Sequence, residues 1–198
     1  MRNLYHFTDS MRLARILRSV ELRPATYVDA MAGARDFVHA TSNQHGEKTA
    51  ATTMSDPDRK FYRGRSYAKV RFTLDAADFE QWLTVIGRYP EWTPKMIKAL
   101  EDRGHENGSS PYSWYARAEP LPLDKVVAVH TMEYPDNRWR PFDLSVAEIS
   151  TVEGRPDIMC VRIGDEIFFS ERFVDLDGIT GYKFKPAVPL STFAQAAE

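Results

Sequence analysis

The sequence predicts an α+β fold, in which a strand-rich core is accompanied by two or three helices. Residues 3–8, NLYHFT, are rich in aromatic residues and apolar at alternate positions, as is typical of a strand. Residues 66–74, SYAKVRFTL, alternate polar and apolar side chains and predict a second strand. Residues 91–104, EWTPKMIKALEDRG, carry the start and stop signals of a helix: a capping threonine, a proline at the first position and Gly104 past the end.

A helix is expected directly after the first strand. Thr8 or Asp9 can cap it, because their side-chain oxygens accept a free backbone N–H of the first turn. Pro24 prevents the helix from continuing. The apolar residues of this helix recur at near-helical spacing: Leu13, Ile16, Leu17 and Val20.

The middle of the chain predicts further short elements. Residues 36–42, DFVHATS, are a strand candidate, and residues 76–83, AADFEQWL, predict a helical turn or two. Residues 113–133 predict two strands around a proline-containing bend. The polar residues 42–65 between these elements predict an excursion over a surface or a cleft.

The chain changes character near residue 134, and two domains are therefore expected, 1–133 and 134–198. Residues 135–141, PDNRWRP, read as a linker. After it, short strands are expected in the C-terminal extension, which should pack on the first domain. Their sequences are DIMCVRI, EIFFSE and GYKFKP.

Composition excludes several classes of protein. The 26 basic and 28 acidic residues give a formal charge of -2 and no electrostatic reason to expect bulk binding to nucleic acid or membranes. The single cysteine, Cys160, lies in an apolar run and is expected to be a small buried hydrophobe. One thiol fits a reducing compartment. With no apolar run near membrane-spanning length and no signal-peptide pattern, we expect a cytoplasmic protein without a membrane partner.

The residues that can carry chemistry begin with His6, between Tyr5 and Phe7. It can be a hydrogen-bonded structural residue or the floor of an active site. Thr8 shares its strand face, and residues 39–42, HATS, supply a second polar strand. Glu119 ends SWYARAE, directly before the apolar PLPLDKVVAV.

Over residues 3–132 this arrangement resembles ADP-ribosyltransferase-like domains, which also occur in small phage-encoded families. The opening strand YHFT, the helix after it and a short L-R-P strand are similar to the start of that fold. WYARAEPLPLDKVVAV is similar to its later segment, in which an acidic residue precedes an apolar strand. The resemblance implies a split β-sheet core.

The resemblance also implies NAD as co-substrate and assigns roles to five residues. His6 and Thr8 would bind the NAD ribose, and Thr41 or Ser42 would line the nicotinamide pocket. Glu119 would be the catalytic acid, because a carboxylate stabilises an oxocarbenium-like ribose and orients a nucleophile. The acceptor of ADP-ribose stays open among protein, nucleic acid and small molecules. The pyrophosphate could meet any of three arginines: Arg12, Arg15 or Arg35.

Three alternatives stand beside this interpretation, and the sequence does not favour the first of them, a metal site. His39, His45 and Glu47 form only a loose cluster without established metal spacing, so no metal is expected. RNA 2′-phosphotransferases share the fold and need several basic groups to bind phosphate. Four basic residues on or beside one predicted strand could supply them: Arg63, Arg65, Lys69 and Arg71. These four residues could equally form a solvated face of that strand. No G-x-S-x-G, P-loop or G-x-G-x-x-G motif occurs.

The third alternative is a non-enzymatic partner-binding protein. Residues 166–188, EIFFSERFVDLDGITGYKFKPAV, resemble the ending of a family of bacterial immunity proteins, with Ser170 capping a short helix. Such a protein needs a large surface that is apolar at its centre. The aromatic residues that could form one, or could instead fill the core, are Trp82, Trp92, Trp139, Phe168, Phe169 and Phe173.

Overall fold

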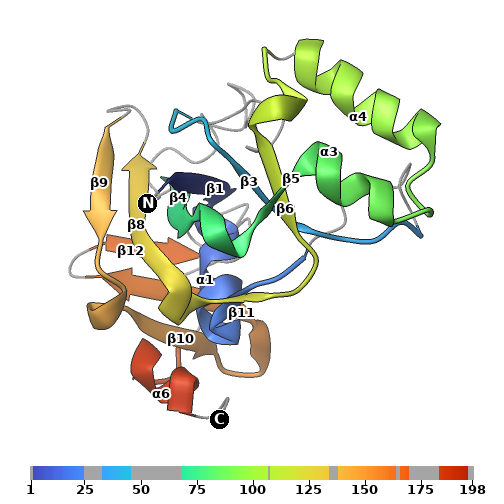
Figure 1. The fold of residues 1–198 in the computed structure, drawn as a ribbon. Coiled ribbons are helices and arrows are strands. Elements are labelled where there is room, and N and C mark those ends of the chain that lie inside the picture. Colours follow the sequence, from blue (N-terminus) through green and yellow to red (C-terminus); the bar gives the residue numbers. More distant parts are fainter. Residues whose placement is uncertain are drawn as a thin grey trace. The chain divides into compact units, whose positions relative to one another are not determined.

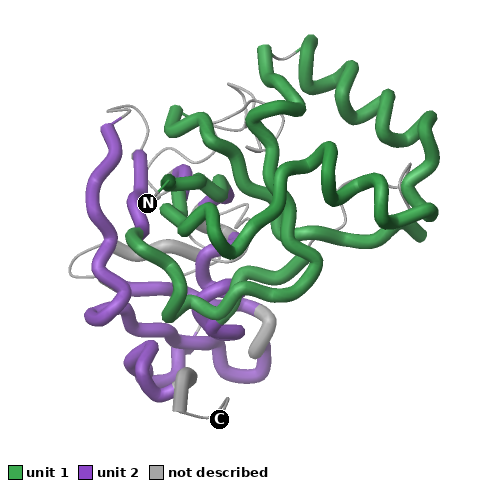
Figure 2. Tube along the Cα trace, in the orientation of Figure 1, with its two compact units in different colours: residues 1–7, 21–53, 71–128 green, residues 8–20, 54–70, 129–198 purple. Residues whose placement is uncertain are grey.

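The computed structural model describes residues 2–24, 33–45, 68–106, 108–133, 138–163, 166–169 and 183–195. It divides into two units that are discontinuous in sequence (Figure 2). Unit 1 holds residues 1–7, 21–53 and 71–128, and unit 2 holds residues 8–20, 54–70 and 129–198. The expected contiguous domains, 1–133 and 134–198, stay a prediction.

The predicted mixture of helices and strands is confirmed (Figure 1). The strands are β1 (Asn3–Asp9), β2 (Glu21–Leu22), β3 (Val38–Thr41), β4 (Ala68–Asp75), β5 (Glu80–Gln81), β6 (Trp114–Arg117), β7 (Leu121–Pro122), β8 (Val126–Glu133), β9 (Trp139–Phe142), β10 (Glu148–Val152), β11 (Arg155–Ile163), β12 (Glu166–Phe169) and β13 (Val188–Pro189). The described α-helices are α1 (Ser10–Ser19), α3 (Trp82–Val85), α4 (Pro94–Glu106) and α6 (Leu190–Gln195), against the two or three predicted.

Short 3-10 helices connect several of these elements. They are η2 (Ala76–Asp78), η3 (Ile86–Arg88), η4 (Pro111–Ser113), η5 (Leu123–Lys125) and η6 (Leu144–Val146). The strands form a seven-stranded sheet, β5-β6-β3-β1-β4-β8-β9, a four-stranded sheet, β12-β11-β10-β13, and the pair β2-β7. None of the helices among the described residues is long and apolar enough to cross a bilayer.

The register of three antiparallel strands in unit 1 decides which side chains share a face of the sheet. Tyr5 of β1 is opposite Thr41 of β3, which is opposite Trp114 of β6. Directly opposed residues point to the same face, and neighbours along a strand point to opposite faces. His6 therefore points to the face opposite that of Thr41.

The face that carries Thr41 and Trp114 is covered by an aromatic core. α3 packs against β5 and β6, and one side of α4 contributes apolar residues to the same core (Figure 1). The rings of Trp82 and Trp92 meet edge to face with centroids 5.3 Å apart, and Phe37 packs on both. The other buried members are Val85, Ile86, Trp114 and Ala116.

Helix α4 corrects one sequence-based expectation. Thr93 and Pro94 open it as predicted, and the Thr93 hydroxyl accepts a hydrogen bond from the Met96 N–H (3.3 Å). Gly104 does not end the helix, which continues to Glu106. The glycine instead gives Trp114 room to pack against the helix, because a side chain there would meet the indole ring.

Strand β4 confirms the predicted apolar face, since Val70, Phe72 and Leu74 are fully buried. A solvated face was one interpretation of the polar residues of this strand, but the opposite face of β4 is not simply solvated. Thr73 is buried, and the Arg71 guanidinium lies 5.3 Å from the ring centre of Tyr5 and donates to the Gln44 carbonyl oxygen. Burial lowers the pKa of Arg71 from its ordinary value.

Unit 2 is built on the antiparallel strands β10, β11 and β12, and α1 contacts β11 and β12. Asp9, not Thr8, caps α1: its carboxylate accepts a hydrogen bond from the Arg12 N–H (3.0 Å), while Thr8 is still in the strand. Leu13 and Leu17 are buried as the helical spacing predicted, together with Ala14, whereas Ile16 and Val20 are only partly buried. Cys160 is buried in β11, which confirms its expected role.

Two C-terminal expectations are wrong. Trp139–Phe142 is not a linker but β9, which tolerates Pro141 because β9 is the last strand of its sheet and a proline there breaks no ladder. GYKFKP contains no strand among its described residues. Lys183–Lys185 instead pairs with β10 through two backbone hydrogen bonds and the bridge between Phe184 and Val152. The expected helix after Ser170 lies outside the described residues.

Candidate functional site

His6 is held in place by the neighbouring strand. Its Nδ1 lies 2.7 Å from the backbone carbonyl oxygen of His39, so Nδ1 carries the proton and donates. In the neutral ring, Nε2 then carries the lone pair. The ring also contacts Phe72, with centroids 6.1 Å apart. The structure therefore gives His6 a structural hydrogen bond and at the same time fixes its tautomer.

His39 itself belongs to the aromatic core rather than to a polar cleft. Its ring packs against Phe37 (6.0 Å) and Trp82 (5.8 Å), although the residue keeps some exposure. Burial lowers the pKa of His39 to about 3, and the nearby charge of His6 adds to this shift. His39 is thus neutral near pH 7.

The other predicted cofactor-binding residues lie on or beside the same strands. Thr8 is buried two residues after His6, on the same face of β1. Thr41 is buried, and its hydroxyl accepts a hydrogen bond from the Asn43 N–H (3.1 Å). Ser42 follows β3, and its N–H donates to the Ser113 carbonyl oxygen (2.9 Å). By alternation Ser42 shares the face of His6, whereas Thr41 does not.

Glu119 lies apart from this group. β3 lies between β1 and β6, and Glu119 comes two residues after the end of β6, whereas Thr41 is opposite its first residue. At about 3.3 Å per residue, the five residues from Trp114 to Glu119 separate Thr41 from Glu119 by at most roughly 16 Å along the strand direction. By the same register Ser42 is level with Leu4, four residues and so roughly 13 Å from Thr8 along β1. His6, Thr8 and Ser42 share a face of the sheet but do not form one cluster, and Glu119 is exposed.

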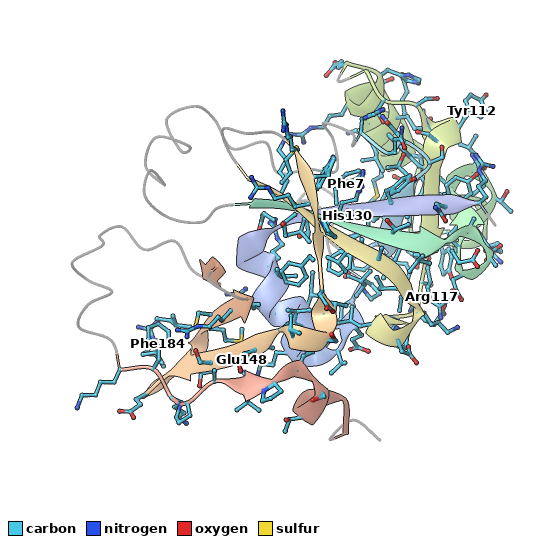
Figure 3. All side chains as sticks on the ribbon, turned by 90° about the vertical axis from the view of Figure 1, so that its left-hand side faces the viewer. Phe7, Tyr112, Arg117, His130, Glu148 and Phe184 are labelled. Carbon is cyan, nitrogen blue, oxygen red and sulfur yellow. The ribbon has the colours of Figure 1, made fainter. Side chains whose placement is uncertain are left out.

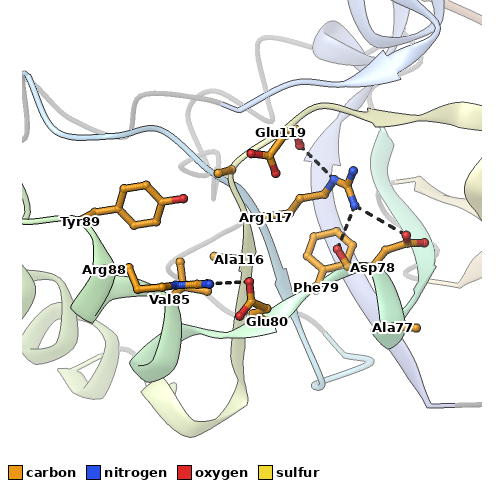
Figure 4. A pocket seen from close by; sticks show the side chains of 11 residues that line it. Ala77, Asp78, Phe79, Glu80, Val85, Arg88, Tyr89, Ala116, Arg117 and Glu119 are labelled. Carbon is orange, nitrogen blue, oxygen red and sulfur yellow. Dashed lines mark hydrogen bonds and ion pairs between the residues drawn. The ribbon is translucent and has the colours of Figure 1, made fainter.

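Glu119 instead lines a pocket of about 340 Å³ in unit 1 (Figure 4). The pocket lies beside the edge strand β5, between η2, η3 and the end of β6. The residues that line it are Ala77, Asp78, Phe79, Glu80, Val85, Arg88, Tyr89, Ala116, Arg117, Ala118 and Glu119. None of the other four predicted site residues is among them.

Ion pairs organise the charged side chains of the pocket. The Arg88 guanidinium donates to the Glu80 carboxylate (2.6 Å). Arg117 donates to the backbone carbonyl oxygens of Asp78 and Glu119 (both 3.2 Å), and it lies 3.6 Å from the Asp78 carboxylate. The Lys125 ammonium reaches the same carboxylate of Asp78 (3.1 Å). Arg117 thus ties the segment that carries Glu119 to η2.

Sequence reasoning found Glu119 but missed the charged residues around it. Asp78, Glu80 and Arg88 lie in short helices and a two-residue strand, where no periodic pattern marks a functional residue. Arg117 carried a weak signal, because it precedes Glu119 by two residues at the end of an apolar strand. Its contact with Asp78 is a tertiary one and cannot be read from local sequence.

The alternatives from the sequence gain little from the geometry. Among the described residues no group of three or more His, Cys, Asp or Glu side chains could hold a metal ion. Glu47, Arg63 and Arg65 lie outside those residues. Arg12, one of the expected pyrophosphate ligands, pairs with the Asp9 carboxylate in unit 2.

The aromatic surface expected of a partner-binding protein loses two of its six candidate residues. Trp82 and Trp92 are buried in the core of unit 1. Tyr112, 77% exposed (Figure 3), lies on a different element from each of the other exposed large apolar residues. Among the described residues, the other exposed large apolar side chains are Leu83, Val127 and Val146. Single exposed apolar side chains are normal on protein surfaces.

Comparisons with known proteins give no further assignment: no family model matches the chain, and no similar curated protein or solved structure is found.

Proposed function

We propose that the protein is an ADP-ribosyltransferase-like enzyme, with an ADP-ribosyltransferase-like sheet core, that binds NAD and transfers ADP-ribose to an acceptor. The hydrogen bond from His6 Nδ1 to the His39 carbonyl oxygen carries this proposal. It holds the ring in the tautomer whose Nε2 can accept a hydrogen bond from a ribose hydroxyl. Thr8 and Ser42 share the face of His6 and are assigned to the same half of NAD.

Glu119 is assigned the chemical step. The bond between ribose C1′ and nicotinamide breaks, and its electron pair leaves with nicotinamide. The carboxylate stabilises the oxocarbenium-like ribose and takes the proton of the acceptor as the new bond forms. Because Glu119 lies on an open pocket, an acceptor can reach it.

NAD binding measured by calorimetry tests the proposal first. Saturable binding should be lost in His6→Ala and retained in His105→Ala, which removes an exposed histidine from α4. Circular dichroism checks that both variants are folded. Absence of NAD binding by the wild-type chain, or unchanged binding by folded His6→Ala, would contradict the assignment.

The role of Glu119 has a separate readout. Glu119→Gln keeps the shape of the side chain and removes its charge, so NAD should still bind while release of nicotinamide is lost. Glu106→Gln neutralises an exposed carboxylate on α4 and should leave release unchanged. Wild-type release of nicotinamide by Glu119→Gln would remove Glu119 from the mechanism.

A further inference from the structure

The charges at the pocket that contains Glu119 are unevenly distributed. Three carboxylates and two guanidinium groups line it. Arg88 is bound to Glu80, whereas Asp78 has two cationic partners, Arg117 and Lys125. Within 4 Å the described residues supply no ion pair to Glu119. With Lys125 the formal charges balance, so the negative charge that a ligand could meet is local to Glu119.

The negative charge of Glu119 also acts on Arg88, which lines the same pocket. The hydrogen bond to Glu80 raises the pKa of Arg88 above its usual value, and the charge of Glu119 contributes to the same rise. Two carboxylates thus act on a single guanidinium at this end. An anionic ligand would meet net repulsion there, whereas a cation would be attracted.

The walls of the pocket also suit an organic cation. The ring of Tyr89 is fixed against Phe37, with centroids 5.1 Å apart and an edge-to-face angle of 78°. Figure 4 shows the Tyr89 hydroxyl directed toward the middle of the lining residues, with Glu119 and Arg88 on either side. Phe79 supplies a second ring. The Tyr89 hydroxyl can accept a hydrogen bond from an ammonium or guanidinium N–H.

We propose that this pocket binds a small organic cation that carries a guanidinium or primary ammonium group. The Glu119 carboxylate accepts its N–H bonds, and Tyr89 flanks it. Arg117 fixes the backbone of Glu119 through the hydrogen bond to its carbonyl oxygen, so the carboxylate is presented from an anchored segment. The site does not require NAD and goes beyond the proposed transfer of ADP-ribose.

A pair of probes of equal shape tests the charge requirement. The isotopically labelled chain is titrated with n-propylguanidine and with neutral n-propylurea, and amide resonances are followed by NMR. Saturable shifts at Tyr89 and Glu119 are expected with the guanidine, and binding of the urea should be weaker by about tenfold. The shifts should fade as salt is added, because the carboxylate is exposed.

Variants decide whether Glu119 is the ligand. Glu119→Gln should weaken binding of n-propylguanidine by about tenfold, whereas Glu106→Gln on α4 should leave it unchanged. Equal binding of the two probes, unchanged binding by Glu119→Gln, or no binding by the wild-type chain would overturn the inference. All titrations are made without NAD, so either proposal can fail while the other stands.

Discussion

Gly104 and Trp114 meet so closely that the helix has no room for a side chain at this position. A Cβ atom on Gly104 would lie 2.5 Å from Cζ2 and 2.6 Å from Cη2 of Trp114. The indole cannot easily move away, because its Nε1 donates a hydrogen bond to the Ser109 hydroxyl (2.8 Å). The glycine within α4 is therefore a packing residue.

Gly104→Ala is expected to destabilise the protein although alanine favours helices. Overpacking costs about 1–3 kcal/mol, while the gain in helix propensity is about 1 kcal/mol. Urea unfolding should show a net loss of about 1 kcal/mol. Gly87→Ala is the control, because no atom lies within 4 Å of a Cβ built there. A more stable Gly104→Ala variant would mean that Trp114 has room to shift.

Val20→Gly is expected to stabilise the protein. Val20 follows α1 in the left-handed region, with φ 57°, where a β-branched side chain is strained by about 1–3 kcal/mol. Glycine removes this strain but adds freedom to the unfolded chain, so a net gain of about 1 kcal/mol is expected in urea unfolding. Ser19→Gly, within the helix, should instead destabilise. Destabilisation by Val20→Gly would show that lost packing exceeds the strain.

Stability should fall as the pH is lowered from about 6.5 toward 3, because of His39. The unfolded chain binds a proton at this histidine near its ordinary pKa of 6.5, whereas in the folded chain its pKa is about 3. Protonation therefore favours unfolding, with a slope of at most about 1.4 kcal/mol per pH unit. Urea unfolding across this range should show the slope reduced in His39→Gln and unchanged in the exposed control His105→Gln. An equal slope in His39→Gln would assign the pH dependence elsewhere.

Trp82→Phe is expected to cost less stability than Trp92→Phe. Both indoles are buried in the same core, but Trp92 Nε1 donates to the Arg35 carbonyl oxygen (2.9 Å) whereas Trp82 Nε1 is buried with no hydrogen-bond partner among the described residues. An unpaired buried N–H costs about 1–3 kcal/mol, and Trp82→Phe removes it. This gain offsets part of the free-energy cost of the volume that the substitution loses. Thermal or urea unfolding of the two variants gives the comparison. The reverse order would mean that Trp82 has a partner in solution.

Local patterns in the sequence predicted those parts of the fold that local chemistry determines. Alternation identified β4, and the spacing of apolar residues identified α1. Gly104 was expected to end the helix, but the glycine is there because Trp114 leaves no room for a side chain. Rules for helix ends do not take such a tertiary contact into account. β9 was missed because Pro141 is acceptable only on the last strand of a sheet, and strand order is a tertiary property.

The candidate site was predictable to the same limited degree. His6 and Ser42 come from two segments that the sequence predicted as strand candidates, whereas the pairing of these strands was not predicted. Glu119 was identified through a resemblance, but its partners were not. Its pocket depends on Arg88 and Arg117, whose roles follow from where η3 and the end of β6 come to lie. Such convergence of segments cannot be read from one sequence.

The two end strands of the seven-stranded sheet have a consequence for association between copies of the chain. β5 contains only two residues, and β9 has Pro141 among its four. A foreign strand that docked on β5 would gain few backbone hydrogen bonds, and one on β9 would find a residue without an N–H. Growth of the sheet from molecule to molecule, the usual first step of β-aggregation, is therefore disfavoured at both ends.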